Sequence, residues 1–402
     1  MHVSWQTRRL ADVCQIKPPK VEARRRLADT DSVSFVPMED LGIDQKFLVP
    51  TQTRPLTDVA GSYTYFADGD VLLAKITPCF ENGKLGIAAD LTNGIGFGSS
   101  EYIVFRPDAS VDKEWLYYFL AQPRFREEGA ERMSGAVGHK RVAKDFIEGY
   151  PIPIPPLPEQ RRIVGILDEA FEGIATGKAN AEKNLQNARA FFESHLQSVF
   201  TQRDDGWEER RLGDISKEFG RGKSKHRPRN DPRLYGGPYP FIQTGDISQS
   251  DHWLTQHSQT YSKVGLAQSR LWPRGTICIA IVGATVGETA ILDFEACFPD
   301  SVIGIVVNEH LADSEYVEYL LQAFKTLLKE KGKGTARDNI NLGTFEDQRF
   351  PFPSVKQQKQ IVVTLNALQE ETNRLASIYQ QKLAALDELK KSLLHQAFSG
   401  EL

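Results

Sequence analysis

PEQRRIVGILDEAFEGIATGKANAEKNLQNARAFFESHLQSVF, residues 158–200, predicts the long helix around which the rest of the chain is organised. Read from Ile163 in alternating steps of four and three, its inner positions form a heptad seam. The seam comprises Ile163, Leu167, Ala170, Ile174, Gly177, Ala181, Leu185, Ala188, Phe192, His195 and Val199. About 42 residues at ~1.5 Å each make a rod on the order of 60 Å. Such a rod is far longer than an ordinary globular helix.

A second copy of this seam follows at a constant offset and without a gap, since Ile163 recurs as Ile361. The second seam comprises Ile361, Leu365, Leu368, Thr372, Leu375, Tyr379, Leu383, Leu386, Lys390, Leu393 and Ala397. The first seam is rich in small residues such as Gly177, whereas the second carries bulky ones such as Leu386. Because small and large side chains interdigitate best with each other, we expect the two helices to pair within one chain.

The segments in front of the two helices repeat as well. SWQTRRLADV at 4–13 reappears as GWEERRLGDI at 206–215, and each copy ends in a Pro-rich stretch, YPIPIPPLP (150–158) or RFPFPS (349–354). Proline breaks regular structure and fixes an extended entry into the helix. Pro158 suits the first helical position, and Ser354 and Gln357 have capping-box spacing. The expected domains are 1–150, a first long helix with its entry at 151–205, a second domain at 206–348, and a second long helix at 349–402.

Within each domain, short apolar runs alternate with polar turns, which predicts strands followed by loops. The matching pairs are 34–41 with 240–247, 66–84 with 271–289, and 94–108 with 295–309. Amphipathic runs at 113–129 and 314–332 predict one helix per domain. The fold class is therefore α+β, with two similar β-rich domains joined by two long helices.

Composition excludes several classes of protein. The 402 residues are 40% hydrophobic and 25% charged, with a net charge of −4. We expect a cytoplasmic protein without a membrane segment, because eighteen consecutive apolar residues and a hydrophobic signal core are both absent from the sequence. The four cysteines are scattered without a CxxC motif, so we predict no metal site.

Local charge is more informative than total charge. RGKSKHRPRNDPR at 221–233 holds six arginines and lysines against Asp231 alone, a net charge of +5 with His226 neutral. Gly- and cation-bearing loops follow at 135–145 and 332–341. Arginine and lysine neutralise phosphate, and amide side chains pair with adenine edges, so these loops suit nucleic acid. A merely solvated loop remains the alternative for each of them.

The candidate DNA-binding residues are polar or cationic and lie in these loops or in the Gly- and Thr-bearing loops after the predicted strands. They are Lys75, Thr77, Asn82, Lys84, His139, Lys140, Arg141, Lys144, Arg221, Lys223, Lys225, His226, Arg227, Gln243, Thr244, Arg337 and Asn339.

A catalytic constellation is not found in the sequence. GRGKS at 220–224 has Lys217 where a phosphate-binding loop requires glycine. HExxH, GxSxG and GxGxxG motifs are missing, as are the Asn-Pro-Pro-aromatic and Asp-Pro-Pro-Tyr runs of DNA aminomethyl transfer. Two similar units without catalytic residues indicate a bivalent reader.

The run PIPPLPEQRRIV (153–164), repeated after a second variable unit, resembles the specificity subunit of type I restriction-modification systems. AKITPCFENGK (74–84) and the ending HQAFSGEL (395–402) share this resemblance. The resemblance implies two target-recognition domains, each reading one half of a bipartite double-stranded DNA target. It also implies that the two long helices form an antiparallel coiled coil, which sets the unread gap, in a pseudo-twofold molecule.

The same resemblance implies a non-catalytic chain with catalytic partners. Two modification subunits would bind S-adenosylmethionine and methylate adenine, and restriction subunits would use ATP and Mg to translocate and cut DNA; this chain would hold no cofactor. We expect the modification subunits to dock on exposed helix positions such as Arg161, Arg162, Lys356 and Lys359. The second copy, PFPSVKQQKQIV, has Ser354, Val355 and Gln357 where the first has Pro156, Leu157 and Glu159, so the two contacts should differ.

A coiled-coil scaffold that reads no specific DNA is the alternative hypothesis. The neighbouring open reading frames distinguish the two, since a specificity subunit requires a methyltransferase and a helicase-nuclease beside it.

Overall fold

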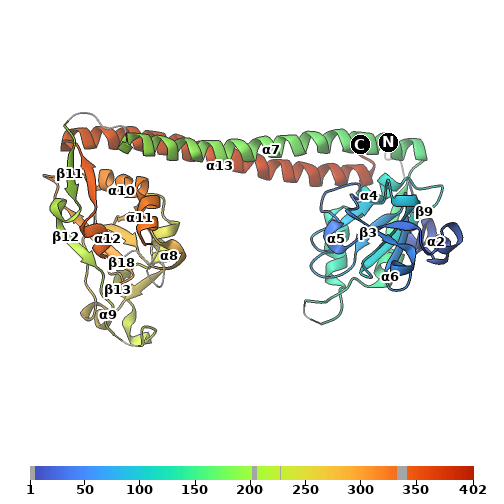
Figure 1. Cartoon of the computed structure of the whole chain (residues 1–402), viewed down its shortest axis with the longest axis horizontal. Coiled ribbons are helices and arrows are strands. Elements are labelled where there is room, and N and C mark those ends of the chain that lie inside the picture. Colours follow the sequence, from blue (N-terminus) through green and yellow to red (C-terminus); the bar gives the residue numbers. More distant parts are fainter. Residues whose placement is uncertain (1–4, 137, 202–205, 227, 333–341) are drawn as a thin grey trace. The chain divides into compact units, whose positions relative to one another are not determined.

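The computed structural model describes residues 5–136, 138–201, 206–226, 228–332 and 342–402. The chain divides into two compact units: unit 1 comprises residues 1–182 and 381–402, and unit 2 comprises residues 183–380. Each unit contains one β-rich domain and about half of each long helix, α7 (Leu157–Thr201) and α13 (Val355–Ser399) (Figure 1).

The two long helices pack against each other in both units, antiparallel. In unit 1, Ile163 near the start of α7 shares a buried cluster with Leu394 near the end of α13. In unit 2, Phe192 near the end of α7 shares one with Leu365 near the start of α13. Every position of both predicted seams is buried or half-buried. The expected intramolecular pair is therefore confirmed.

Small residues of the first seam do face large residues of the second. A Cβ atom added at Gly177 would lie 3.3 Å from Leu386 Cδ1, which is tighter than most real Cβ contacts. Beside this contact, Lys178 Nζ lies 2.6 Å from Asp387 Oδ1. Glycine at position 177 thus lets the bulky leucine approach the α7 backbone.

The two long helices begin differently, as the sequence indicated, although α7 begins one residue earlier than expected. Gln357 Oε1 accepts the Ser354 N–H at 3.2 Å, and Ser354 Oγ accepts the Gln357 N–H at 3.4 Å, so the capping box of α13 is confirmed. Helix α7 begins at Leu157, which makes Pro158 its second residue instead of its first. Proline is tolerated there because first-turn N–H groups have no partner inside the helix.

Both β-rich domains are closed by the same two-stranded ribbon. In unit 1, β1 (Gln6–Arg9) pairs antiparallel with β10 (Pro151–Ile154). In unit 2, β11 (Glu208–Arg211) pairs in the same way with β19 (Arg349–Phe352). Prolines are tolerated in such ribbons because each strand has an unpaired edge. The repeated opening motif and the Pro-rich ending of each domain are therefore one structural element.

The main sheet has the same strand order in both units. In unit 1 the order is β2 (Cys14–Ile16), β9 (Tyr102–Pro107), β6 (Val71–Ala74) and β7 (Leu85–Ile87). In unit 2 it is β12 (Ser216–Arg221), β18 (Val302–Val307), β16 (Ile277–Ala280), β17 (Thr289–Leu292) and β14 (Trp253–Leu254). The fifth strand, β14, runs parallel to β17, and unit 1 has a single parallel bridge, Phe47↔Ile87, in its place.

The amphipathic run predicted as one helix in each domain is broken into two. Unit 1 has α4 (Lys113–Leu120) and α5 (Pro123–Glu131), and unit 2 has α10 (Ser314–Ala323) and α11 (Lys325–Gly332). Pro123 causes the first break, because proline disfavours helical backbone at the preceding residue, and Gln122 is extended. The second break falls at Phe324, which has φ −88° and ψ 2°.

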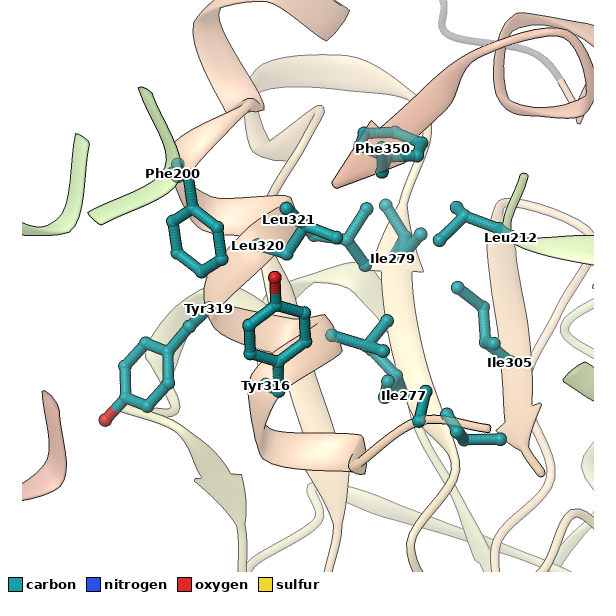
Figure 2. Packing of buried hydrophobic residues seen from close by; sticks show 14 of the residues in the cluster. Phe200, Leu212, Ile277, Ile279, Ile305, Tyr316, Tyr319, Leu320, Leu321 and Phe350 are labelled. Carbon is teal, nitrogen blue, oxygen red and sulfur yellow. The ribbon is translucent and has the colours of Figure 1, made fainter. Parts of the chain in front are cut away.

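Helix α10 lies between the helix pair and the main sheet of unit 2. Figure 2 shows Tyr316 and Leu320 between Phe200 of α7 and the β16 residues Ile277 and Ile279. The Tyr316 hydroxyl donates to the Pro351 carbonyl at 2.8 Å. In unit 1 the same connection is repeated, since Trp115 Nε1 of α4 donates to the Pro153 carbonyl at 3.1 Å. One apolar core therefore joins the helix pair, the covering helix and the sheet in each unit.

The second sheet differs between the units. Unit 1 has four strands in the order β4 (Gln52–Pro55), β3 (Ser32–Val36), β8 (Ile95–Gly98) and β5 (Thr64–Ala67). Within its described residues, unit 2 has the pair β13 (Tyr235–Phe241) and β15 (Gln259–Tyr261) there. In Figure 1, β13 and α9 (Lys263–Ala267) lie at the end of unit 2 away from the helices. The two domains are thus alike beside the helices and diverge farther out.

Short helices complete the described chain. They are α1 (Leu10–Val13), α2 (Val21–Arg26), α3 (Leu56–Val59), α6 (Lys144–Gly149), α8 (Thr244–Gln249) and α12 (Leu342–Glu346). In the ranges that the structure describes, none of the helices combines the length and the apolarity needed to span a bilayer.

Candidate nucleic-acid interface

Two loops of unit 1 that the sequence singled out separately are joined into one surface. The Thr77 N–H donates to the Lys140 carbonyl at 2.9 Å, and the Val142 N–H donates to the Lys75 carbonyl at 3.0 Å. These backbone bonds hold the 75–84 loop beside the 134–144 segment. The candidates Lys75, Thr77, Lys140 and their neighbours therefore belong to one site.

Glu101 organises the cations of this surface. Arg141 makes a two-pronged contact with the Glu101 carboxylate at 2.9 and 2.7 Å, and Lys75 Nζ lies 3.9 Å from it. Lys75 Nζ also donates to the Ser100 carbonyl at 2.9 Å. The Arg141 hydrogen bonds hold the pKa of Glu101 below its ordinary value, and burial lowers the pKa of Lys75. Two predicted DNA contacts are thus partly neutralised before DNA arrives.

The remaining candidates of unit 1 divide into inward and outward side chains. Lys84 Nζ donates to the Met38 carbonyl at 2.7 Å, and Thr77 Oγ1 donates to Glu81 at 2.8 Å, so both serve contacts within the domain. Asn82, His139, Lys140 and Lys144 are exposed, and Lys144 lies 3.4 Å from Glu148. These four side chains are exposed to solvent, as is that of Arg141.

The basic segment of unit 2 begins at the end of β12, and the exposure of its first residues alternates. Arg221, Lys223 and Lys225 are exposed, whereas Gly222 and Ser224 between them are buried. Side chains alternate across a strand, so the three cations share one side at a spacing of ~7 Å. A Cβ atom at Gly222 would lie 2.3 Å from the Phe298 carbonyl oxygen, so glycine is required for this close approach. We call these three cations the basic strip.

The rest of the basic segment is less cationic than its sequence suggests. Arg229 lies 2.7 Å from Asp300, a residue far away in the chain, and Arg233 lies 2.7 Å from Asp231. His226 Nε2 is 2.9 Å from the same Asp231. The Arg233 hydrogen bond holds the pKa of Asp231 well below its ordinary value. The net charge of +5 counted along the sequence therefore overstates the local charge, because it omits Asp300.

Gln243 lies next to the basic strip. The Ile242 N–H donates to the Cys297 carbonyl at 2.8 Å, and the Lys223 N–H donates to the adjacent Phe298 carbonyl at 3.1 Å. The Gln243 side chain is exposed, and its amide donates to Gln259 Oε1 at 2.7 Å. Thr244 begins α8 and is half-buried.

Three predicted DNA-binding residues, Arg227, Arg337 and Asn339, lie outside the described residues, as does most of the 332–341 loop.

Aromatic residues support this surface, and the sequence reasoning overlooked them. Phe241 and Tyr261 stack with ring centroids 3.9 Å apart, and Tyr235 contacts Tyr261 at 5.4 Å. The Tyr235 hydroxyl donates to the Arg229 carbonyl at 2.6 Å, which connects the stack to the basic segment. The signal was the alternation of tyrosine, glycine and proline in YGGPYPF at 235–241.

The proposed docking residues lie at the two helix starts and are exposed. Arg161 has a 70% exposed side chain and lies 3.5 Å from Asp112, and Arg162 pairs with Glu159 at 2.8 Å. Arg162 also donates to the Leu402 carbonyl at 2.8 Å. Lys356 and Lys359 are exposed as well.

A buried glutamine beside these residues was missed. Gln160 Oε1 accepts the Asp112 N–H at 2.8 Å, and its amide donates to the Ser110 and Pro155 carbonyls at 2.8 Å. Gln358 repeats the arrangement with the Asp313 N–H, the Leu311 carbonyl and the Pro353 carbonyl. Both glutamines are fully buried. Their recurrence at the same position of the two helix copies was the available signal.

Comparison with known proteins identifies the class to which this fold and its duplicated site belong. The family model "Type I restriction modification DNA specificity domain" matches residues 2–184 and again residues 204–384. The chain belongs to this family.

Individual relatives agree with that assignment. The specificity subunit of the Escherichia coli type I restriction enzyme EcoAI is 38% identical over 161 residues, which cover 40% of this chain and 27% of that protein. The putative MjaX specificity subunit of Methanocaldococcus jannaschii is 22% identical over 415 residues, covering 99% of this chain and 93% of that protein.

Solved structures show the same fold. One, described as "Structural basis underlying complex assembly and conformational transition of the type I R-M system", has a chain that matches with a TM-score of 0.81 at 19% identity. That match covers 99% of this chain and 98% of the other. The HsdS subunit of Thermoanaerobacter tengcongensis matches with a TM-score of 0.64 at 19% identity, over 99% of this chain and 97% of its own. The expected class, two β-rich domains with two long helices, is confirmed.

Proposed function

We propose that this chain is the DNA-reading subunit of a type I restriction-modification complex, in which each β-rich domain contacts one half of a two-part target. The observation that carries the proposal is the duplicated surface. Each unit presents exposed cations and amides on loops gathered at one place, built on a main sheet of the same strand order. The two family matches support the same reading.

The charges suit a DNA backbone better than a protein partner. The basic strip places Arg221, Lys223 and Lys225 along one extended segment, and the structure records no ion pair for these three among the described residues. Unpaired cations at regular spacing neutralise successive phosphates and release counterions. The neighbouring amide of Gln243 has the chemistry to recognise an adenine edge.

The partners follow from the duplicated helix starts. We propose that two modification subunits, which bind S-adenosylmethionine, dock at Arg161 and Arg162 in unit 1 and at Lys356 and Lys359 in unit 2. Restriction subunits using ATP and Mg would complete the complex in the cytoplasm, and this chain would contribute recognition without catalysis. Both sites share the buried glutamine but differ in exposed charge, which supports two similar and non-identical contacts.

Methylation-sensitive sequencing of the host genome with and without this chain tests the proposal. We expect adenine methylation at one bipartite sequence, lost when the chain is deleted and restored when it is supplied again. A methylation pattern that is the same in both strains would contradict DNA reading and leave the scaffold hypothesis.

A further inference from the structure

A lysine of unit 1 connects a loop of the β-rich domain to the helices beside it. Lys46, between β3 and β4, has its ammonium 2.7 and 2.8 Å from the two carboxylate oxygens of Asp168 on α7. It also forms an ion pair with Glu114 of α4 and lies 5.1 Å from the ring centre of Tyr118. The Tyr118 hydroxyl donates to the same Asp168.

A histidine occupies the corresponding place in unit 2. His252 Nδ1 is 2.7 Å from Glu318 Oε2, and its Nε2 is 3.4 Å from Glu315 Oε2. The imidazole stacks on the Tyr319 ring with centroids 4.5 Å apart and planes 18° from parallel. Glu318 is fully buried, and His252 is 9% exposed.

The internal repeat makes Lys46 and His252 equivalent. Pairing SFVPMEDL (34–41) with PFIQTGDI (240–247) places Lys46 opposite His252. In the same way Glu114 and Tyr118 of α4 correspond to Glu315 and Tyr319 of α10, and Asp168 of α7 corresponds to Asn366 of α13. The Tyr319 hydroxyl donates to Asn366 at 2.6 Å, as Tyr118 does to Asp168.

Both loops also reach α13 through a neighbouring aspartate. In unit 1, Asp44 lies 2.7 Å from Lys390. In unit 2, Asp251 accepts from Gln369 at 3.2 Å and from Asn373 at 2.6 Å. His252, which follows Asp251, is also bound to the main sheet of unit 2, because its backbone carbonyl accepts the Ile291 N–H at 3.0 Å. Each loop is thus a junction between sheet, covering helix and helix pair.

We infer that Lys46 and His252 are equivalent positioning residues that hold their loops against the covering helix of each unit, α4 or α10, and that only the contact of unit 2 depends on protonation. A protonated imidazole has two N–H donors and can serve both Glu318 and Glu315. A neutral imidazole has one, so a nitrogen lone pair then faces a carboxylate. A lysine ammonium carries its charge throughout the pH range in which histidine titrates.

The groups around His252 determine the direction of the effect. Glu315, Glu318 and Tyr319 face it from α10, Gln322 donates to Glu318, and Asp251 precedes it in the chain. Thr289 of β17 donates to Glu318 at 2.6 Å, and Lys325 of α11 is held by Glu288 at 2.6 Å. Burial lowers the pKa of His252, but the hydrogen bond that the imidazole donates to Glu318 and the charges of Glu318 and Glu315 outweigh burial and raise the pKa above its ordinary value. The stabilisation is therefore complete below about pH 6.5 and is lost as pH rises through the raised value.

Hydrogen exchange on the full chain at pH 6 and pH 8.5, corrected for intrinsic exchange rates, tests the inference. We expect protection of residues 249–254 to fall at the higher pH. The fall should be about tenfold for each unit by which the pKa of His252 in the closed loop exceeds its pKa in the open loop. Residues 44–48 should keep their protection, which provides the internal control. Because neither DNA nor a partner is present, the result is independent of the proposed function.

Exchanging the two residues sharpens the test. His252→Lys should make the unit 2 loop insensitive to pH, and Lys46→His should give the unit 1 loop the dependence that unit 2 has lost. A measurement on the unaltered chain guards against misfolded variants: the His252 imidazole, followed by NMR, should titrate above the ordinary histidine value. Titration at or below that value, or loop protection that is equal at both pH values, would overturn the inference.

Discussion

A buried glutamine at the start of each long helix, Gln160 or Gln358, has three backbone hydrogen-bond partners. Gln160 accepts one backbone N–H and donates to two backbone carbonyls, while its own side chain is fully buried. An unsatisfied buried polar group costs ~1–3 kcal/mol, whereas an exposed ion pair contributes little. The hydrogen-bonding role of Gln160 therefore matters more to stability than the charged residues on either side of it.

Gln160→Ala should destabilise unit 1 by ~1–3 kcal/mol, because it leaves the Asp112 N–H and its neighbours unpaired. Glu159→Ala is the matched control on the same helical turn; its partner Arg162 is exposed, and we expect a change within ~0.5 kcal/mol. Urea denaturation of the two variants makes the comparison. Equal losses for both would show that Gln160 has no special role.

Removing the basic strip should weaken DNA binding in a salt-dependent way. Each phosphate contact contributes roughly one unit to the slope of log affinity against log salt, so Arg221→Ala, Lys223→Ala and Lys225→Ala together should reduce it by about three. Arg233→Ala is the control, since Asp231 already occupies that guanidinium. Fluorescence anisotropy over a salt series measures the slope. An unchanged slope would mean that the basic strip is a solvated loop that does not contact DNA.

The sequence was sufficient to find these cations but not to rank them. Exposure alternates along residues 221–225, as expected of extended backbone, and this alternation predicts that Arg221, Lys223 and Lys225 are exposed together. The partners of Arg229 and Arg141 are Asp300 and Glu101, which the fold brings from distant segments, so no local pattern announces them. The DNA contacts themselves stay predictions.

Among the elements, the long helices were the most predictable and the second sheets the least. The heptad period recurs over many residues, so it is easy to detect, and the Pro-rich stretch marks where each helix starts. Pro123 lies inside the amphipathic run and marks a helix break, but our sequence prediction of a single helix did not take it into account. The strands β13 and β15 are short, and their pairing depends on contacts from elsewhere in the domain, so their sheet could not be read from periodicity.

Packing between the seams can be tested at Gly177. Gly177→Leu should cost ~1–3 kcal/mol by overpacking against Leu386, and Leu386→Ala in the same chain should recover part of that loss. Gly173→Leu is the matched control on α7, because a Cβ atom there meets no atom within 4 Å. Thermal unfolding gives the four free energies of the cycle. Additive losses at 177 and 386 would mean that the two residues do not share a contact.

At the scale of the whole molecule, the equal lengths of α7 and α13, 45 residues each, make the helix pair a candidate ruler. One heptad inserted after Lys178 and another before Asp387, which face each other at 2.6 Å, lengthens both helices at the same level. The added length is ~10 Å, or about three base pairs at ~3.4 Å each.

The gap between the two half-sites should then grow by about three base pairs, while the half-sites stay the same. Activity should fall, because three base pairs rotate the second half-site by roughly 100° at about ten base pairs per turn. Methylome sequencing reads the outcome. Modified sites with the original gap would contradict the ruler, and a heptad inserted in α7 alone is the control that should disrupt the pairing of the seams.

The ribbons β1·β10 and β11·β19 have a consequence for how the gene can change. Gln6 pairs with Ile154 and Glu208 with Phe352, so the chain enters and leaves each domain on neighbouring strands. A crossover within the DNA that encodes the opening motif and another within the Pro-rich ending would replace the domain and spare both helices. Exchange of residues 10–150 with those of a relative should therefore alter one half of the methylated sequence, measurable by methylome sequencing, and a change in both halves would contradict independent reading. Because the chain carries the same two junctions twice, recombination could also move a domain from one position to the other, so that a host lineage would acquire new target sequences by rearranging DNA that it already holds.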